Sequence, residues 1–141
     1  MSIKTVAHVN LRGNAREALE FYRSVFGGDL VAVTYAEART AAGPDEADHV
    51  MWGQVASAAG FHIMAFDVPS ERPYHPGESS YFVSVRGEDA EEIRGYWDKL
   101  REGAAVISDL APSGWAPLYG MLTDRFGVTW TLDVATAYAP S

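Results

Sequence analysis

The feature that most constrains the fold is a pattern that occurs twice along the 141-residue chain. Each time, an extended apolar segment leads into a helix N-cap residue, an amphipathic stripe, a terminating glycine and further extended segments. The caps are Asn14 and Asp89, and the glycines that end the two helices are Gly27 and Gly103. We therefore predict two copies of a strand–helix–three-strand (βαβββ) module.

The two modules together define an α+β fold in a single domain of ordinary size. Each module is predicted to hold one helix and four strands, with a loop rich in proline and glycine between the modules. Module one covers residues 3–67, the linker covers 68–78, and module two covers 79–134. The predicted strands are 3–11, 30–36, 50–56, 61–67, 79–86, 104–110, 118–124 and 128–134.

The composition excludes several classes of protein. A hydrophobic fraction of 48% supports a packed core, and the absence of cysteine removes disulfides and thiolate metal sites. The net charge of −8, without a basic stripe, argues against a nucleic-acid partner. No segment has the length of a membrane span, and the start of the chain lacks the apolar run of a secretory signal. We expect a cytoplasmic protein without a membrane partner.

Strand alternation divides each predicted sheet into a helix-covered face and an open face. In the first strand, Val9 and Leu11 suit the helix-covered face, so His8 and Asn10 point the other way. The same parity places both polar and apolar residues on the open faces, a mixture typical of small-molecule pockets. A solvated sheet face is the alternative. The further open-face residues are Met64, Phe66, Ser80, Phe82, Ser84, Thr131 and Asp133, the last interpreted as an exposed charge near a strand end.

Two segments carry a resemblance to a known family. They are HVNLRGNAREALEFYRSVFGG at 8–28 and WAPLYGMLTDRFGVTW at 115–130. Both resemble the vicinal-oxygen-chelate superfamily of glyoxalases, bleomycin-resistance proteins and extradiol dioxygenases, and most of all its PhnB-like branch, often labelled 3-demethylubiquinone methyltransferase-like. The resemblance implies paired βαβββ modules that form a curved, cup-like mixed sheet. It also implies a homodimer, often with cups built from modules of both chains.

The resemblance also implies where a metal would bind. Metal-dependent members supply ligands from four strand positions, which by register are His8, Met64, Ser80 and Thr131. Only His8 is a usual ligand for a divalent metal, because a thioether is soft and hydroxyls bind weakly. We predict no cofactor, with a divalent metal as the alternative. His8 is the candidate catalytic residue, as a metal ligand or as a general base, since histidine exchanges protons near neutral pH.

The loop around Trp115 offers a lid for a flat ligand. Pro112 and Pro117 flank this tryptophan, and core packing does not require it there; an interface or packing role is the alternative. We expect a small-molecule-binding protein without an intact catalytic metal site. The alternatives are a lyase, isomerase or oxygenase-type enzyme of the same superfamily, or a dimeric interaction module without a small ligand. The predicted ligand contacts are His8, Met64, Ser80, Phe82, Trp115 and Thr131.

Overall fold

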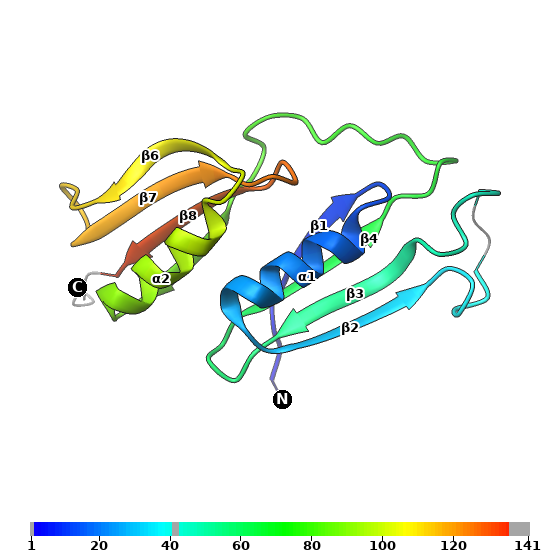
Figure 1. Cartoon of the computed structure of the whole chain (residues 1–141), viewed down its shortest axis with the longest axis horizontal. Coiled ribbons are helices and arrows are strands. Elements are labelled where there is room, and N and C mark those ends of the chain that lie inside the picture. The colour runs from blue at the N-terminus through cyan, green and yellow to red at the C-terminus, as the bar shows by residue number, and fades with distance from the viewer. Residues whose placement is uncertain (1, 41–42, 136–141) are drawn as a thin grey trace. The chain divides into compact units, whose positions relative to one another are not determined.

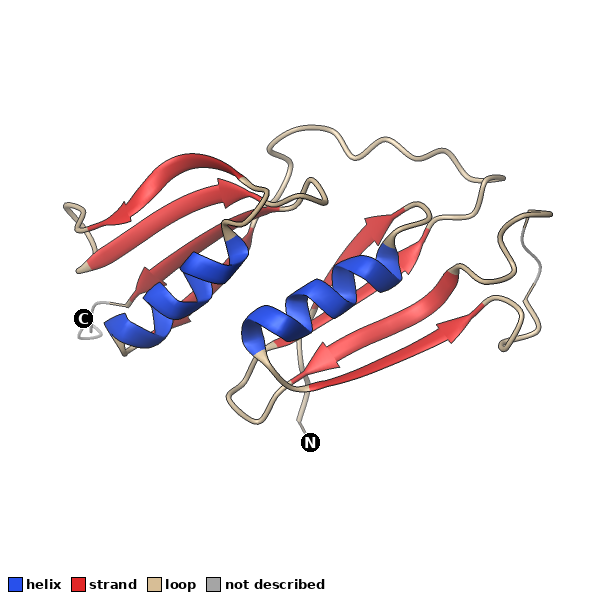
Figure 2. Ribbon diagram, in the orientation of Figure 1, coloured by secondary structure: helices blue, strands red, loops and turns tan. Residues whose placement is uncertain are grey.

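The computed structural model describes residues 2–40 and 43–135 and divides into two compact units, 1–77 and 78–141. The division falls inside the predicted linker. Each unit is a four-stranded mixed sheet with one helix on one face (Figures 1 and 2). Neither helix has the length and apolar character needed to cross a bilayer, and the described residues hold no other candidate. The elements are β1 (Ala7–Leu11), α1 (Ala15–Phe26), β2 (Asp29–Thr34), β3 (Val50–Ala56), β4 (His62–Asp67), β5 (Val83–Gly87), α2 (Ala90–Leu100), β6 (Ala105–Ala111), β7 (Leu118–Thr123) and β8 (Thr129–Val134).

The two sheets have the same topology. Their strand orders are β1-β4-β3-β2 and β5-β8-β7-β6, and the first pair in each is parallel while the rest are antiparallel. The parallel pair follows from the βαβββ order. The helix returns the chain so that the second strand runs in the same direction as the first, and two antiparallel connections then give the fourth strand that direction as well. The predicted fold class is confirmed, and equivalent positions in the two units can be matched by register.

The helix-covered faces form the two cores. In the first unit, α1 buries Leu19 and Tyr22 on one side of its sheet. In the second unit, Trp97 of α2 and Trp130 of β8 are 3% and 0% exposed. Gly120 of β7 lies directly under the helix, and a Cβ there would come within 2.8 Å of the Trp97 ring. The glycine therefore lets the indole lie close against the sheet.

The first helix is capped by a residue far away in the sequence. Asn14 precedes α1, but its side chain makes no capping hydrogen bond, so the predicted capping role is wrong. Instead, Asp67 at the end of β4 is buried and its Oδ1 accepts from Gly13 N at 2.7 Å and from Ala15 N at 3.0 Å. Its Oδ2 accepts from Val50 N at 2.9 Å. One carboxylate thus joins the start of α1 to two strands.

The second helix is capped as its sequence predicts. The Asp89 carboxylate accepts from Glu91 N at 3.0 Å. This is a local bond over two residues, and it satisfies one of the free backbone donors at the helix start.

Both parallel strands begin later than predicted. The prediction starts them at residues 3 and 79, whereas pairing starts with Ala7 on Ile63 and Val83 on Trp130. Strand propensity is present at residues 3–6, but the described residues of the first sheet provide no neighbouring strand for them to pair with. Tyr81 lies before the first paired residue of β5 and is 55% exposed.

A buried carboxylate fixes the loop between β2 and β3. Glu46 accepts hydrogen bonds from Ser70 N, Ser70 Oγ and Gly43 N, and its Oε2 lies 3.8 Å from His49 Nδ1. The hydrogen bonds from Ser70 lower the pKa of Glu46. His49 Nδ1 is buried and has no hydrogen-bond partner among the described residues.

Candidate ligand-binding site

The open face of the first sheet places His8 and Met64 side by side. His8 pairs with Met64 in β4, and Met64 pairs with Gln54 in β3, so these three residues form one row across the sheet. Side chains of directly paired residues lie on the same face, about 5 Å apart at Cβ. Asn10 and Phe66 form the start of the next row. This face therefore alternates polar groups with a thioether and a phenyl ring.

The two histidines of this face are held by neighbouring amides. His8 Nδ1 lies 3.0 Å from Asn10 Oδ1, and His62 Nε2 lies 2.8 Å from Gln54 Oε1. Because an amide oxygen only accepts, each of these ring nitrogens is the donor. His8 also meets the Phe66 ring edge-on, with centroids 5.3 Å apart. In the neutral form of the ring this leaves Nε2 of His8 as the acceptor nitrogen, and it has no hydrogen-bond partner in residues 2–40 and 43–135.

The second sheet shifts the predicted partner of Thr131. Ser84, and not Ser80, pairs with Thr131, which in turn pairs with Met121 of β7. Ser80 lies before the first residue of β5 and is exposed. The two serines share the same parity, so alternation alone could not choose between them. In register, Ser84 and Thr131 are the counterparts of His8 and Met64.

The next row of the second sheet contains an ion pair. Arg86 pairs with Asp133, and Asp133 pairs with Tyr119. Arg86 Nε donates to both carboxylate oxygens of Asp133, at 3.2 and 3.3 Å. Asp133 is only 9% exposed, so the interpretation of this residue as an exposed charge is wrong. Alternation alone puts Arg86 on the open face, because it shares the parity of Ser84, but alternation does not predict its pairing with Asp133.

The Trp115 side chain projects from an ordered turn. It is 59% exposed, and its ring meets the Tyr119 ring edge-on at 5.1 Å. Ser113 Oγ accepts from Ala116 N at 3.1 Å, and Ser113 N donates to Ala116 O at 3.0 Å. The turn thus presents an indole beside the open face of its own sheet.

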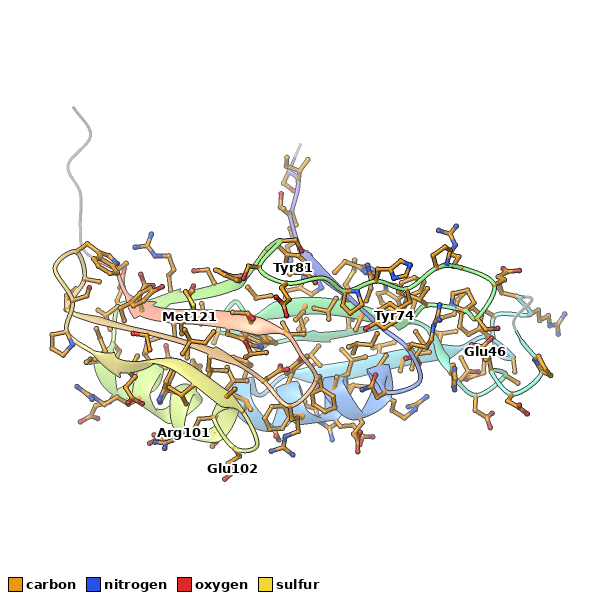
Figure 3. The ribbon with its side chains drawn as sticks, turned by 90° about the horizontal axis from the view of Figure 1, so that it is seen from above. Glu46, Tyr74, Tyr81, Arg101, Glu102 and Met121 are labelled. Carbon is orange, nitrogen blue, oxygen red and sulfur yellow. The ribbon has the colours of Figure 1, made fainter. Side chains whose placement is uncertain are left out.

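The open face and the helix face of the second unit are clearly separated. Figure 3 shows Tyr81 and Met121 on the side away from α2, whereas Arg101 and Glu102 lie on the α2 side. Phe82, which precedes β5, is 41% exposed. The second unit therefore has exposed aromatic side chains next to its row of hydroxyls.

The residues at the four family metal positions do not fit a divalent cation. His8, Met64, Ser84 and Thr131 supply one imidazole, one soft thioether and two neutral hydroxyls, whereas a catalytic site needs about three good ligands. Among the described residues, no group of three His, Cys, Asp or Glu side chains is placed to hold a metal. Ser84 takes the place predicted for Ser80 among these four positions, and because both are serines the chemistry of the possible metal ligands is the same.

Known structures share this architecture over nearly the whole chain. The PA1353 protein of Pseudomonas aeruginosa superposes with a TM-score of 0.83 at 29% identity, covering 96% of this chain and 100% of that one. The PhnB protein of Bacillus cereus superposes with a TM-score of 0.72 at 26% identity, covering 94% and 100%. The YjdN protein of Escherichia coli K12 is 23% identical over 136 residues, which are 90% of this chain and 92% of YjdN.

The family model for the glyoxalase/bleomycin resistance protein/dioxygenase superfamily matches residues 5–132. This match spans both βαβββ units and both motifs that carry the resemblance, so the family predicted from the sequence is confirmed. The superfamily name alone covers several chemistries, and membership does not choose among them. The chain belongs to the glyoxalase/bleomycin resistance protein/dioxygenase superfamily.

Proposed function

We propose that the protein binds a small organic molecule on its open sheet faces, without a catalytic metal. The observation that carries the proposal is the row of His8, Met64 and Gln54, with Phe66 against His8. These are oriented polar groups beside apolar ones, on the face opposite α1. On the open face of the first unit the proposed contacts are His8 and Met64. In the second unit, treated as a separate face, they are Ser80, Phe82, Trp115 and Thr131.

In the proposed binding mode, polar and apolar groups of this face contact different parts of the ligand. His8 Nε2 can accept a hydrogen bond from a ligand hydroxyl or amide, because its Nδ1 is already bonded to Asn10. Met64 and Phe66 offer an adaptable apolar surface next to it, since a thioether on an unbranched chain adjusts to irregular shapes. A ligand with one polar group on an apolar body matches this arrangement.

A metal-independent enzyme is the second candidate. A general base needs an acceptor nitrogen and a neighbour that holds the ring, and His8 has both through its bond to Asn10. The substrate would then place an acidic proton within hydrogen-bond distance of Nε2. Turnover that is lost in His8→Ala and retained in His75→Ala would favour this candidate over simple binding.

We also propose that a second copy of the chain covers the exposed apolar residues near the parallel strands. Ile3 and Tyr81 are 92% and 55% exposed, and each precedes a strand at the edge of its sheet. Edge strands with apolar neighbours are prone to association. Light scattering at micromolar concentration should give the mass of a dimer. A monomer mass would contradict this part of the proposal.

A thermal-shift screen against metabolites and antibiotics tests the proposed function. A ligand that binds only the native state stabilises it by about 2.7 kcal/mol at a hundred times its Kd. We expect at least one compound to raise the melting temperature of the wild type and to lose most of that effect in His8→Ala. His75→Ala is the matched control, because it removes an exposed histidine from the linker. Hits that stabilise both variants equally would place the site elsewhere.

A further inference from the structure

From the second open face we infer the class of ligand: a planar aromatic molecule that carries an anionic group. The inference rests on the proposed function and deepens it. It assigns Arg86 as the group that binds the anion and Trp115 with Tyr119 as the surface that binds the ring. These three residues lie in the second unit, so the assignment needs only the geometry of that unit.

The anion site is the outward edge of a guanidinium that is already held in place. Asp133 engages Arg86 through Nε alone, with both carboxylate oxygens within 3.3 Å. Within the described part of the chain, neither terminal nitrogen of Arg86 makes a hydrogen bond. The Arg86 side chain is 54% exposed while that of Asp133 is 12% exposed, so the donor side of the pair is the accessible one. A guanidinium presents its donors in a fixed fork that matches a carboxylate.

The aromatic surface lies in the same row. Tyr119 is the next neighbour of Asp133 across the sheet, which puts it about 10 Å from Arg86 at two strand spacings. Trp115 contacts the Tyr119 ring edge-on and is 59% exposed. A bicyclic ring resting on these side chains can direct a substituent toward the guanidinium.

Because the surroundings of Arg86 are neutral or acidic, the binding of an anion to this face depends on the arginine. The protein carries a net charge of −8, which repels anions in general. The adjacent row on this face, Ser84, Thr131 and Met121, is neutral. The row of His8, Met64 and Gln54 in the first sheet offers no arginine or lysine. Of these rows, only that of Arg86 therefore provides a permanent cation.

Three probes separate the charge from the ring. Naphthoate carries both features, naphthamide keeps the ring without the charge, and cyclohexanecarboxylate keeps the charge without the ring. Binding of each is measured by isothermal titration calorimetry to the full chain, as wild type and as three variants. The variants are Arg86→Gln, Trp115→Leu and Arg101→Gln, the last being a matched control that removes an exposed arginine on the α2 side (Figure 3).

We expect naphthoate to bind the wild type most tightly. Arg86→Gln should weaken naphthoate about tenfold or more, because a charge-assisted hydrogen bond is lost, and should leave naphthamide unchanged. Trp115→Leu should weaken both naphthalene probes about fivefold and leave cyclohexanecarboxylate unchanged. Arg101→Gln should change none of them. If Arg86→Gln does not fold, Arg86→Lys is measured in its place. It keeps the charge without the fork and should weaken naphthoate less than threefold relative to the wild type, while leaving naphthamide unchanged.

Equal affinity of the wild type for naphthoate and naphthamide would overturn the inference, as would equal effects of Arg86→Gln and Arg101→Gln. If no probe binds at millimolar concentration while the screen yields ligands that depend on His8, the inference fails and the proposed function stands. If neither the probes nor the screen yields a ligand, both fail.

Discussion

The two units share a topology and differ on their open faces. Register makes His8 and Met64 the counterparts of Ser84 and Thr131, yet one pair is an imidazole with a thioether and the other is two hydroxyls. On the helix-covered faces the units stay alike, and the counterpart strands β3 and β7 both place a glycine beneath the helix, at Gly53 and Gly120. The constraint of packing a helix thus preserves one face, while the open face is free to acquire ligand chemistry.

The units also differ in the hydrogen bonds that a buried aspartate makes to the elements around it. The first unit uses Asp67 to join α1, β3 and β4 through three backbone donors. The second uses Asp124, which accepts from Val128 N at 3.0 Å and from Trp130 Nε1 at 2.9 Å, and leaves the cap of α2 to Asp89. A buried carboxylate that binds several donors is costly to remove, whereas a local cap is not. The comparison therefore predicts unequal effects for similar substitutions.

The largest expected effect is that of Asp67→Ala. Three backbone N–H groups lose their acceptor, two of them at the start of a helix, so the free energy of unfolding should fall by about 3–5 kcal/mol. Asp89→Ala, which removes a single exposed cap bond, should cost about 1 kcal/mol. Urea denaturation followed by circular dichroism measures both. Equal losses would mean that Asp67 does not fasten its unit as described.

The next effect contrasts the two glycines under the helices. A Cβ at Gly120 meets the rigid Trp97 ring at 2.8 Å, so Gly120→Ala should cost about 1–3 kcal/mol through overpacking. A Cβ at Gly53 comes within 2.5 Å of the methyl end of Leu19, which can move by changing rotamer. We expect Gly53→Ala to cost less in the same denaturation assay. The reverse order would show that the first unit is the more tightly packed one.

A smaller effect should appear in acid and involve the loop of the first unit. Hydrogen bonds from Ser70 lower the pKa of Glu46 in the folded protein. A lowered carboxyl pKa contributes stability above the pKa of the unfolded chain, and that stability is lost as the pH falls through the folded value. As the pH is lowered, the free energy of unfolding of Glu46→Gln should therefore fall less steeply than that of the wild type. Glu20→Gln, an exposed substitution on α1, is the control and should leave this slope unchanged. An unchanged slope in Glu46→Gln would contradict the role given to this carboxylate.

The smallest effect is expected from Arg86→Gln. Since the arginine side chain is 54% exposed, solvent screens its pairing with Asp133, and the cost to stability should be about 1 kcal/mol or less. The same variant is expected to lose its preference for anionic probes. A loss of several kcal/mol in urea denaturation would instead make Arg86 a structural residue and weaken its assignment to a ligand.

Local signals were enough to predict the repeated modules, both helices and the two faces of each sheet. Caps, glycines and alternation act over a few residues, and Val9 and Leu11 are buried on the helix-covered face as alternation predicts. The sequence-based prediction failed where the role of a residue depends on a partner far away in the sequence. Asp67 caps a helix 52 residues away, and Arg86 meets Asp133 at a separation of 47, distances at which a single sequence carries no pairing signal.

The predicted starts of the first strand in each unit were wrong for a related reason. Residues 3–6 have the alternation of a strand, but β4 begins at His62, and the parallel register starts with the pair of Ala7 and Ile63. A segment with strand propensity and no neighbour does not become part of a sheet. The same late start in the second unit moved the partner of Thr131 from Ser80 to Ser84. The donor chemistry was predictable because the shift preserved parity and residue type.

The most direct test of the proposed binding face is an NMR titration of isotope-labelled protein with the best ligand from the screen. We predict the largest chemical-shift changes on an open face: at His8 and Met64 if the ligand binds the first unit, or at Thr131 and the indole of Trp115 if it binds the second. Residues on the outer surface of α1 and α2, such as Glu20 and Arg94, should change little. Changes concentrated on the two helices, with the open faces undisturbed, would contradict the account.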